Sequence, residues 1–381
     1  MKNLLYLLLF FCPYLLFGQA EKVYSIVTKS YPVDYYATQA KLWKQKVDQS
    51  NSPEAWFNYY TAVRMENILK SERVHDLDAI IEACLKAIPN TYEAHYMYAW
   101  NKGYTPDVKA HLKKAMKINP ERHEAWYHML SFSIQDLDLE GAQRYAKKIY
   151  EQKAFSPGIV NWNYNMLMSL DKDAILLTQG DNDTYPSQIL SYAEGIRTDV
   201  TVINYHMLLH YKDYRDNTFR KLGIAPLDLE EEAVARMSTS DKYRLLCRHI
   251  KKDYKNPLYI SCPVSRQIQE DLSDSLYLEG LAFRYSSKPY DNIPILVDNY
   301  ENRFMMDYLS VTWQPDISES VLRTMNMNYL PALMSVLRHY QENDMPAQFE
   351  KVKALSLAIG QAGGREKVVK KYIANLTQQG K

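Results

Sequence analysis

The feature that most constrains the fold is a strand–helix–strand pattern in the middle of the chain. Residues 173–179 (DAILLTQ) and 199–204 (DVTVIN) are short runs rich in leucine and β-branched residues, which is typical of buried strands. Between them, PSQILSYAEGI carries apolar residues at helical spacing. Two strands joined by one helix pair in parallel through a right-handed crossover. We therefore expect an α/β domain over residues 171–292.

Two further strands are expected in this domain, at residues 257–264 (PLYISCPV) and 278–286 (LEGLAFRYS), with helical segments between them. Together the pattern predicts a small three-layer α/β domain with a mainly parallel sheet. Residues 293–381 are helical in pattern. Within them, residues 328–364 predict one helical hairpin, whose methionine, leucine and aromatic residues recur at intervals of three and four and indicate core packing.

The preceding part, residues 21–170, carries a repeated pattern of helix pairs. PEAWFNYYTAV, YEAHYMYAWNKG and HEAWYHMLSFS each place Ala and aromatic residues after an acidic residue, and each precedes a second helical stretch. Ala110 follows Ala79, and Pro120 follows Pro89, by the same number of residues. In each copy the proline ends the second helix. The pattern resembles tetratricopeptide repeats, which implies a solenoid with a concave peptide-binding face. The alternative is that three hairpins merely pack against the α/β domain.

The first residues have the pattern of a secretory signal peptide. Lys2 precedes the apolar residues 4–17, and the small segment Gly18-Gln19-Ala20 follows, as signal peptidase requires. The apolar run is short for a bilayer span and contains Pro13, so an uncleaved anchor is the weaker alternative. We expect residues 1–20 to be removed, no transmembrane segment to remain, and the mature chain to be exported to the periplasm or cell envelope.

Charge and cysteine content argue against several classes of partner. The chain has 46 Lys and Arg against 45 Asp and Glu, without a basic block, which predicts no nucleic-acid partner. Cys84, Cys247 and Cys262 form no CxxC pair, which argues against a zinc site and against a disulfide framework. Buried free thiols are expected, with a bridge between Cys247 and Cys262 as the alternative in an oxidising compartment.

The loop after the first strand, GDNDT, is where we expect a ligand, because open α/β sheets bind ligands at the carboxyl ends of their strands. Gly180 permits a tight exit from the strand, Asp183 or Thr184 can cap the next helix, and Pro186 suits its first turn. None of these structural roles accounts for the second carboxylate at this helix start, Asp181. The candidate ligand-binding residues are Gly180, Asp181, Asn182, Asp183, Thr184, Asn204, His206 and Arg266, with Tyr205 and Ser265 beside them.

A metal site is the alternative interpretation of this loop. Asp181 and Asp183 form an Asp-x-Asp, which in some nucleotide-sugar transferases holds a divalent cation, and carboxylate oxygens suit Mg²⁺ or Mn²⁺. The loop has one glycine, so it matches neither a P-loop nor a dinucleotide fingerprint. A lone His206 is more often structural than catalytic, and no Ser/His/Asp or Cys/His set stands at motif spacing. We expect no cofactor, with a divalent cation as the alternative.

The block ILLTQGDNDTYPSQILSYAEGIRTDVTVIN resembles the start of the soluble C-terminal region of the domain of unknown function 2723 family of bacterial envelope proteins. That region begins with a GDNDTFP-type loop and continues with an EG-x-R-x-DV-x-V-x-N segment. LYISCPV and LYLEGLAFRYS resemble its later parts in the same order, so the resemblance covers residues 171–364. Members usually carry a polytopic membrane half similar to lipid-linked-sugar glycosyltransferases. Here a signal peptide and helical repeats take its place.

If the family's chemistry lies in the membrane half, the resemblance implies that this chain lacks the catalytic part. We therefore expect an exported, non-catalytic binding or scaffolding protein. The repeats would bind a protein partner of the cell envelope, and the α/β domain would serve as a platform or pocket. Two alternatives remain: a glycan- or nucleotide-sugar-related enzyme or accessory module that uses Asp181 and Asp183, and a purely structural subunit of an envelope complex.

Overall fold

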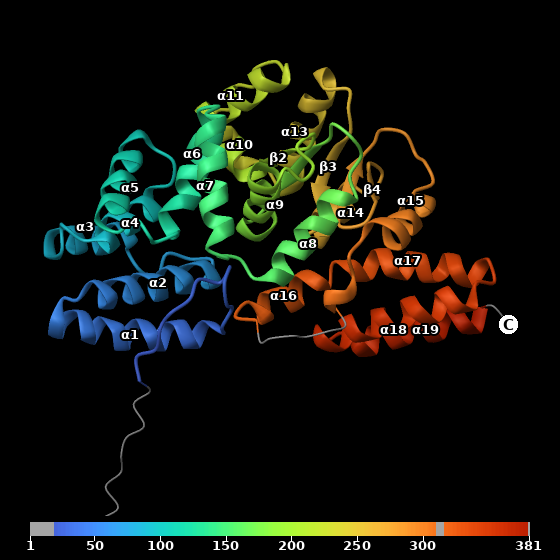
Figure 1. Ribbon diagram of the computed structural model, residues 1–381, viewed down its shortest axis with the longest axis horizontal. Coiled ribbons are helices and arrows are strands. Elements are labelled where there is room, and N and C mark those ends of the chain that lie inside the picture. Colours follow the sequence, from blue (N-terminus) through green and yellow to red (C-terminus); the bar gives the residue numbers. More distant parts are fainter. Residues whose placement is uncertain (1–18, 310–315, 380–381) are drawn as a thin grey trace, which may run out of the picture. The chain divides into compact units, whose positions relative to one another are not determined.

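The computed structural model describes residues 19–309 and 316–379 (Figure 1). Most of the expected signal peptide, residues 1–18, lies outside this range. The described residues divide into two compact units, one of residues 19–24 and 31–89 and the other of residues 25–30, 90–309 and 316–379. This division falls inside the expected repeat region, between its first and second hairpins.

The first unit contains three helices, α1 (Val33–Ser50), α2 (Pro53–Lys70) and α3 (Leu77–Ala87). Helix α2 begins as its sequence predicts, because Ser52 accepts a hydrogen bond from the Ala55 N–H and Pro53 occupies the first helical position. Helix α1 precedes the first expected repeat and packs along α2. The segment that follows the expected cleavage point is also held in this unit, since the Val23 N–H donates to Asn58 Oδ1 at 2.7 Å.

The second unit begins with five helices. They form the second and third expected hairpins and one further helix, and their bounds are α4 (Tyr92–Lys102), α5 (Pro106–Ile118), α6 (Glu124–Gln135), α7 (Leu139–Glu151) and α8 (Pro157–Met168). Within α4/α5, His95 and His111 face each other with their Nδ1 atoms 3.0 Å apart, and the Tyr98 ring stacks on His111. One ring must donate and the other accept, so this contact requires at least one neutral imidazole.

A five-stranded sheet follows, with strand order β2-β1-β3-β5-β4. Strands β1, β2 and β3 are parallel, while β5 pairs antiparallel with both β3 and β4. The bounds of the strands are β1 (Ile175–Thr178), β2 (Thr201–Asn204), β3 (Leu258–Ser261), β4 (Leu276–Leu278) and β5 (Ala282–Tyr285). Helix α9 (Asp181–Glu194) joins β1 to β2 as the predicted crossover. The predicted α/β architecture is confirmed.

The prediction of one strand over residues 278–286 was wrong, because the chain reverses there. Gly280 has φ +119°, a left-handed value that separates β4 from β5 and makes them an antiparallel hairpin. A Cβ on Gly280 would lie 2.8 Å from Phe304 Cζ and 2.9 Å from Ser169 Cβ, so this close approach also requires glycine.

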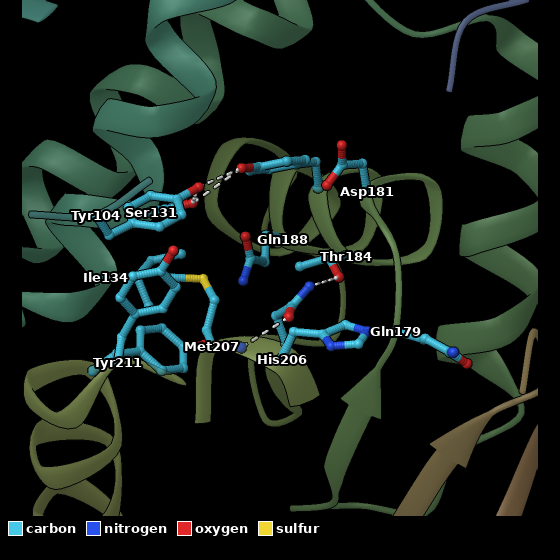
Figure 2. Close-up of a pocket in the computed structure, with 13 residues that line it drawn as sticks. Tyr104, Ser131, Ile134, Gln179, Asp181, Thr184, Gln188, His206, Met207 and Tyr211 are labelled. Atoms are coloured by element: carbon cyan, nitrogen blue, oxygen red, sulfur yellow. Dashed lines mark hydrogen bonds between the residues drawn. The ribbon is translucent and has the colours of Figure 1, made fainter. Parts of the chain in front are cut away.

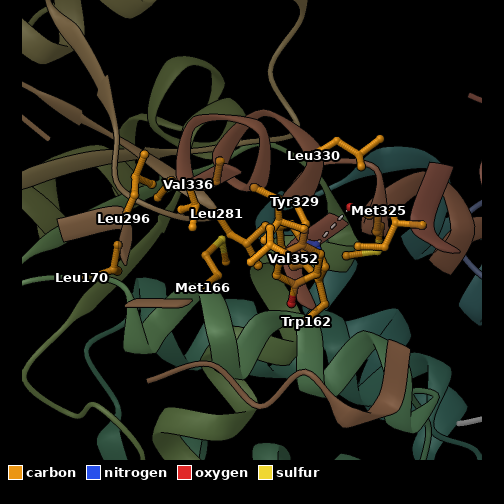
Figure 3. Packing of buried hydrophobic residues seen from close by; sticks show 14 of the residues in the cluster. Trp162, Met166, Leu170, Leu281, Leu296, Met325, Tyr329, Leu330, Val336 and Val352 are labelled. Atoms are coloured by element: carbon orange, nitrogen blue, oxygen red, sulfur yellow. Dashed lines mark hydrogen bonds between the residues drawn. The ribbon is translucent and has the colours of Figure 1, made fainter. Parts of the chain in front are cut away.

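Both faces of the sheet are buried, which produces the three layers. On one face, Leu176 and Tyr259 pack in a cluster with α8 and the C-terminal helices, where Trp162 Nε1 donates to the Met325 carbonyl at 3.1 Å (Figure 3). On the other face, Ile175 and Leu258 pack with helices that follow β2. These helices are α10 (Tyr205–His210), α11 (Lys212–Leu222), α12 (Glu231–Arg236), α13 (Thr239–Asp253) and, after β3, α14 (Arg266–Asp271).

The C-terminal region is helical, as expected. The predicted hairpin at residues 328–364 is α17 and α18, and a further helix, α19, follows it. Within residues 19–309 and 316–379, no helix has both the length and the apolar character required to span a bilayer. The elements are α15 (Ile293–Asp298), a π-helix (Asn299–Arg303), a 3-10 turn (Asp307–Leu309), α16 (Glu319–Asn326), α17 (Tyr329–Glu342), α18 (Pro346–Ala362) and α19 (Glu366–Gln379).

Two charged residues, Arg197 and Glu279, make hydrogen bonds between separate segments of the second unit. The Arg197 guanidinium donates to the carbonyls of Leu167 (2.6 Å), Leu170 (2.9 Å) and Asp171 (2.8 Å), which lie at the end of α8, and it pairs with Asp199. The buried Glu279 accepts the hydroxyls of Tyr259 (2.6 Å) and Tyr290 (2.5 Å).

We predict that Arg197→Ala lowers the free energy of unfolding by about 2–3 kcal/mol, because it removes several charge-assisted hydrogen bonds and leaves helix-end carbonyls without donors. The matched control is Arg266→Ala, since the side chain of Arg266 is 90% exposed and pairs only with Glu270 one helical turn away. Urea titrations followed by circular dichroism would measure both. Equal effects of the two substitutions would contradict the capping role.

We predict that the contact between His95 and His111 makes stability depend on pH. Burial lowers the pKa of both imidazoles, and nearby positive charge at Lys114 lowers each further. The unfolded chain therefore binds protons first, near pH 6.5, and stability is lost as the pH falls from there through the lower folded pKa values. Melting temperatures at pH 7 and pH 5 should differ less in His95→Gln than in wild type, while His339→Gln should behave like wild type.

Candidate functional site

A cavity of about 200 Å³ lies beside the carboxyl ends of β1 and β2 (Figure 2). Residues of α6, α9, α10 and α11 line it, together with Asn204 at the end of β2 and residues of the α4–α5, β1–α9 and α10–α11 connections. This is the position at which open α/β sheets bind ligands. The lining residues are Tyr104, Ser131, Ile134, Gln179, Asp181, Thr184, Tyr185, Gln188, Asn204, His206, Met207, Tyr211 and Tyr214.

Asp183 fixes the geometry of the loop and does not line the cavity. Its carboxylate accepts the N–H groups of Gln179 (2.9 Å) and Gly180 (2.7 Å) and the hydroxyl of Ser261 at the end of β3 (2.5 Å). The residue is only 2% exposed, and burial raises its pKa although all three hydrogen bonds favour the charged form. Asp183 therefore binds the β1–α9 loop to the neighbouring strand, a larger role than the predicted cap.

Asp181 and Asp183 do not converge. Helix α9 begins at Asp181, so the two residues stand two positions apart on a helix and point to different sides. Asp181 is exposed and lines the cavity, whereas Asp183 faces β3. Among the described residues, no three His, Cys, Asp or Glu side chains are grouped as a metal site would require. This loop therefore does not place two carboxylates where they could bind one divalent cation together.

Thr184 and Asn204 are brought together at the ends of β1 and β2. The Asn204 Nδ2 donates to Thr184 Oγ1 at 3.1 Å, and Thr184 Oγ1 also lies 2.6 Å from the hydroxyl of Thr178 in β1. Asn204 Oδ1 accepts the Met207 N–H and so caps α10. Two predicted site residues are therefore neighbours in the cavity wall, held in place by strand and helix ends.

Three residues of the cavity that the sequence did not predict form a triangle of hydroxyl groups. The hydroxyls of Tyr104 and Tyr185 are 2.9 Å apart, and each lies 3.2 Å from Ser131 Oγ. Tyr104 and Ser131 belong to the repeat hairpins, so their position could not be inferred from the α/β segment. Tyr185 directly follows the GDNDT loop, and that adjacency was the one available sequence signal.

Asn182 is not among the lining residues and binds the N-terminal segment of its unit, because its Nδ2 donates to the Val27 carbonyl at 2.9 Å. The prediction that Pro186 lies in the first helical turn was wrong, since the helix starts at Asp181 and places Pro186 in the second turn. Proline has no N–H for the Asn182 carbonyl, and Asn163 Nδ2 supplies that hydrogen bond at 2.8 Å.

Of the remaining candidate ligand-binding residues, one lines the cavity and the others do not. His206 lines the cavity, and burial, together with His210 and Lys242, lowers its pKa below the usual value, so the ring is neutral at pH 7. No hydrogen bond joins His206 to another described residue. Arg266 is absent from the lining and pairs with Glu270, while Ser265 caps α14 and Tyr205 stacks on Tyr243. The pocket that was expected to include Arg266 therefore forms without it.

The comparisons with known proteins identify one segment of this region. Residues 159–226 match the family model of TMEM260-associated domain 2. The matched segment runs from α8 to the loop after α11 and includes the β1–α9 loop, β2 and most of the cavity wall. No match was found among the curated proteins.

We predict opposite outcomes for the two carboxylates of the loop. Asp183→Asn should lower the free energy of unfolding by about 2–4 kcal/mol, because the new amide N–H₂ would face N–H and O–H groups that now donate hydrogen bonds to Asp183. Asp181→Asn should change it by no more than about 0.5 kcal/mol, since Asp181 is exposed. Chemical denaturation of both variants measures this, and a stable Asp183→Asn protein would show that the loop does not depend on this carboxylate.

Proposed function

We propose that this protein is an exported, non-catalytic binding and scaffolding protein of the cell envelope. Its helical hairpins bind a protein partner, and its α/β domain provides a rigid platform with one small ligand pocket. The observation that carries the proposal is a stretch of exposed apolar side chains at the end of α2 and in the loop after it. Ile68, Leu69 and Val74 are 45%, 40% and 42% exposed.

Exposed apolar residues scattered singly need no explanation, but several in one short stretch are typical of a surface that a partner covers. The same region is fixed by polar contacts, because the carboxylate of the buried Glu66 pairs with Lys70 (2.7 Å) and lies 2.8 Å from Nε2 of His75. These contacts hold the end of α2 against the following loop. The apolar residues therefore stand next to a segment that is fixed by these contacts.

A non-catalytic role is supported by how the polar groups of the cavity are arranged. The hydroxyl of Ser131 bonds to tyrosine hydroxyls, and Asn204 and Thr184 bond to each other. The described hydrogen bonds of the Ser131 and Thr184 hydroxyls run to other hydroxyl groups and to an amide, whereas nucleophilic catalysis pairs the nucleophile with a base. Export is supported by the signal-peptide pattern of residues 1–20.

The alternative, a glycan- or nucleotide-sugar-related module, receives less support from the cavity. Nucleotide sugars carry phosphates, which proteins bind with Lys, Arg, metal ions or helix N-termini. None of the described residues that line the cavity is Lys or Arg, and the lining includes the carboxylate of Asp181. A neutral glycan remains compatible with this lining, whereas a nucleotide sugar is a poor fit.

We predict that a photoreactive residue at position 68 forms a crosslinked adduct with an envelope protein in cells, while one at Val368 does not. Val368 is a matched control because it is apolar, 56% exposed and located in α19, outside the hairpins of residues 21–170. Ile68→Glu with Val74→Glu should reduce the adduct formed from position 69 several-fold without lowering the melting temperature. Equal adducts from both positions, or no effect of the glutamates, would contradict a partner surface at α2.

A further inference from the structure

The cavity beside β1 and β2 has an electrostatic character that selects among ligands. Its described lining contains one carboxylate, Asp181, and no Lys or Arg. His206 is neutral at pH 7, because burial and the nearby cationic groups lower its pKa. The charged side chain in the described lining is thus a carboxylate, which disfavours anionic ligands and favours cationic ones at this position.

The walls of the cavity are rich in aromatic rings. Tyr104, Tyr185, Tyr211 and Tyr214 all line it, and the rings of Tyr104 and Tyr211 meet edge to face with centroids 5.2 Å apart. Tyrosine rings attract ammonium groups through their quadrupole, most strongly where water is excluded. Gly103 permits this wall, because φ is +76° there and a Cβ would lie 2.3 Å from the Tyr211 hydroxyl.

Hydrogen-bond acceptors predominate in the same wall. In the triangle of Tyr104, Ser131 and Tyr185, each hydroxyl can donate one hydrogen bond and can also accept. When the three hydroxyl hydrogens bond within the triangle, the Ser131 oxygen keeps a second lone pair as an acceptor. Gln188 lies at the centre of the lining residues, and its Nε2 donates to the Val202 carbonyl at 3.5 Å, which leaves its Oε1 as the acceptor end (Figure 2). A ligand that only donates would match this wall.

We propose that this cavity binds the primary ammonium group of a small organic ligand, with Asp181 as its charge partner and the tyrosine wall as its contact surface. An ammonium has three donors and no acceptor, so it complements both the carboxylate and the hydroxyl triangle. The cavity volume of about 200 Å³ is below the roughly 300–1,000 Å³ of pockets for drug-sized ligands, so the ligand is one ring or one short chain. This inference rests on the proposed function, in which the α/β domain carries the ligand pocket.

The test uses the full mature chain, residues 21–381, with two pairs of probes at pH 7. n-Butylamine represents a lysine side chain and 1-butanol is its neutral counterpart, while glucosamine represents an amino sugar and glucose is its neutral counterpart. Calorimetry and ligand-observed NMR should show binding of at least one amine and weaker binding of its neutral counterpart. The amine that binds identifies the source of the ammonium group.

Asp181→Asn should weaken amine binding about tenfold or more, because it removes the charge but keeps the shape of the side chain. The matched control is Asp213→Asn, which removes an exposed carboxylate from the first turn of α11, next to the cavity but outside its lining. This control should bind like wild type. Circular dichroism melting would confirm that both variants are folded.

Three results would overturn the proposal: no binding of either amine by the folded wild type, binding of both neutral counterparts as tightly as their amines, or amine binding unaffected by Asp181→Asn. If glucose and glucosamine bind equally well and n-butylamine does not bind, the cavity is instead assigned to neutral glycans. Failure of this proposal is separable from failure of the proposed function. Crosslinking from position 68 reports on the partner surface and should persist in Asp181→Asn, whether or not an amine binds.

Discussion

The second unit depends on one buried carboxylate. Asp183 accepts two backbone N–H groups of its own loop and one hydroxyl from β3, and so it joins the end of β1, the start of α9 and the end of the neighbouring strand. A carboxylate that is only 2% exposed needs hydrogen-bond donors around it. Here two donors come from the loop itself and the third comes from the end of β3. The surrounding residues of the loop can then point outward in different directions.

Each of those residues contacts a different segment of the unit. Asn182 binds the carbonyl of Val27, Thr184 binds Thr178 and Asn204, and Tyr185 reaches the repeat hairpins through Tyr104 and Ser131. The loop is therefore a junction between the sheet and the helices around it. Its polar side chains therefore serve as contacts between segments, although the composition alone is also that of a simple turn.

The crossover and the two-sided burial of the sheet could be predicted from sequence, because Leu176 and Ile175 belong to a continuous apolar run that is long enough for one buried strand. The hairpin at Gly280 could not, since a glycine in an apolar run signals a reversal only when its φ is known. The site was predicted in part: Asp181, Thr184, Asn204 and His206 do line one cavity. Tyr104 and Ser131 were missed because contacts between distant segments leave no local pattern.

Helix α9 contains a proline in its second turn, and the hydrogen bond that this proline cannot make is supplied by Asn163 of α8. The helix is thus incomplete as an isolated segment: its Asn182 carbonyl obtains a donor only after α8 has docked. Formation of secondary structure and formation of tertiary structure are therefore coupled at this point. In the unfolded chain, residues 181–194 gain little from becoming helical alone, so the first turns of α9 and its packing against α8 are expected to form in one cooperative step.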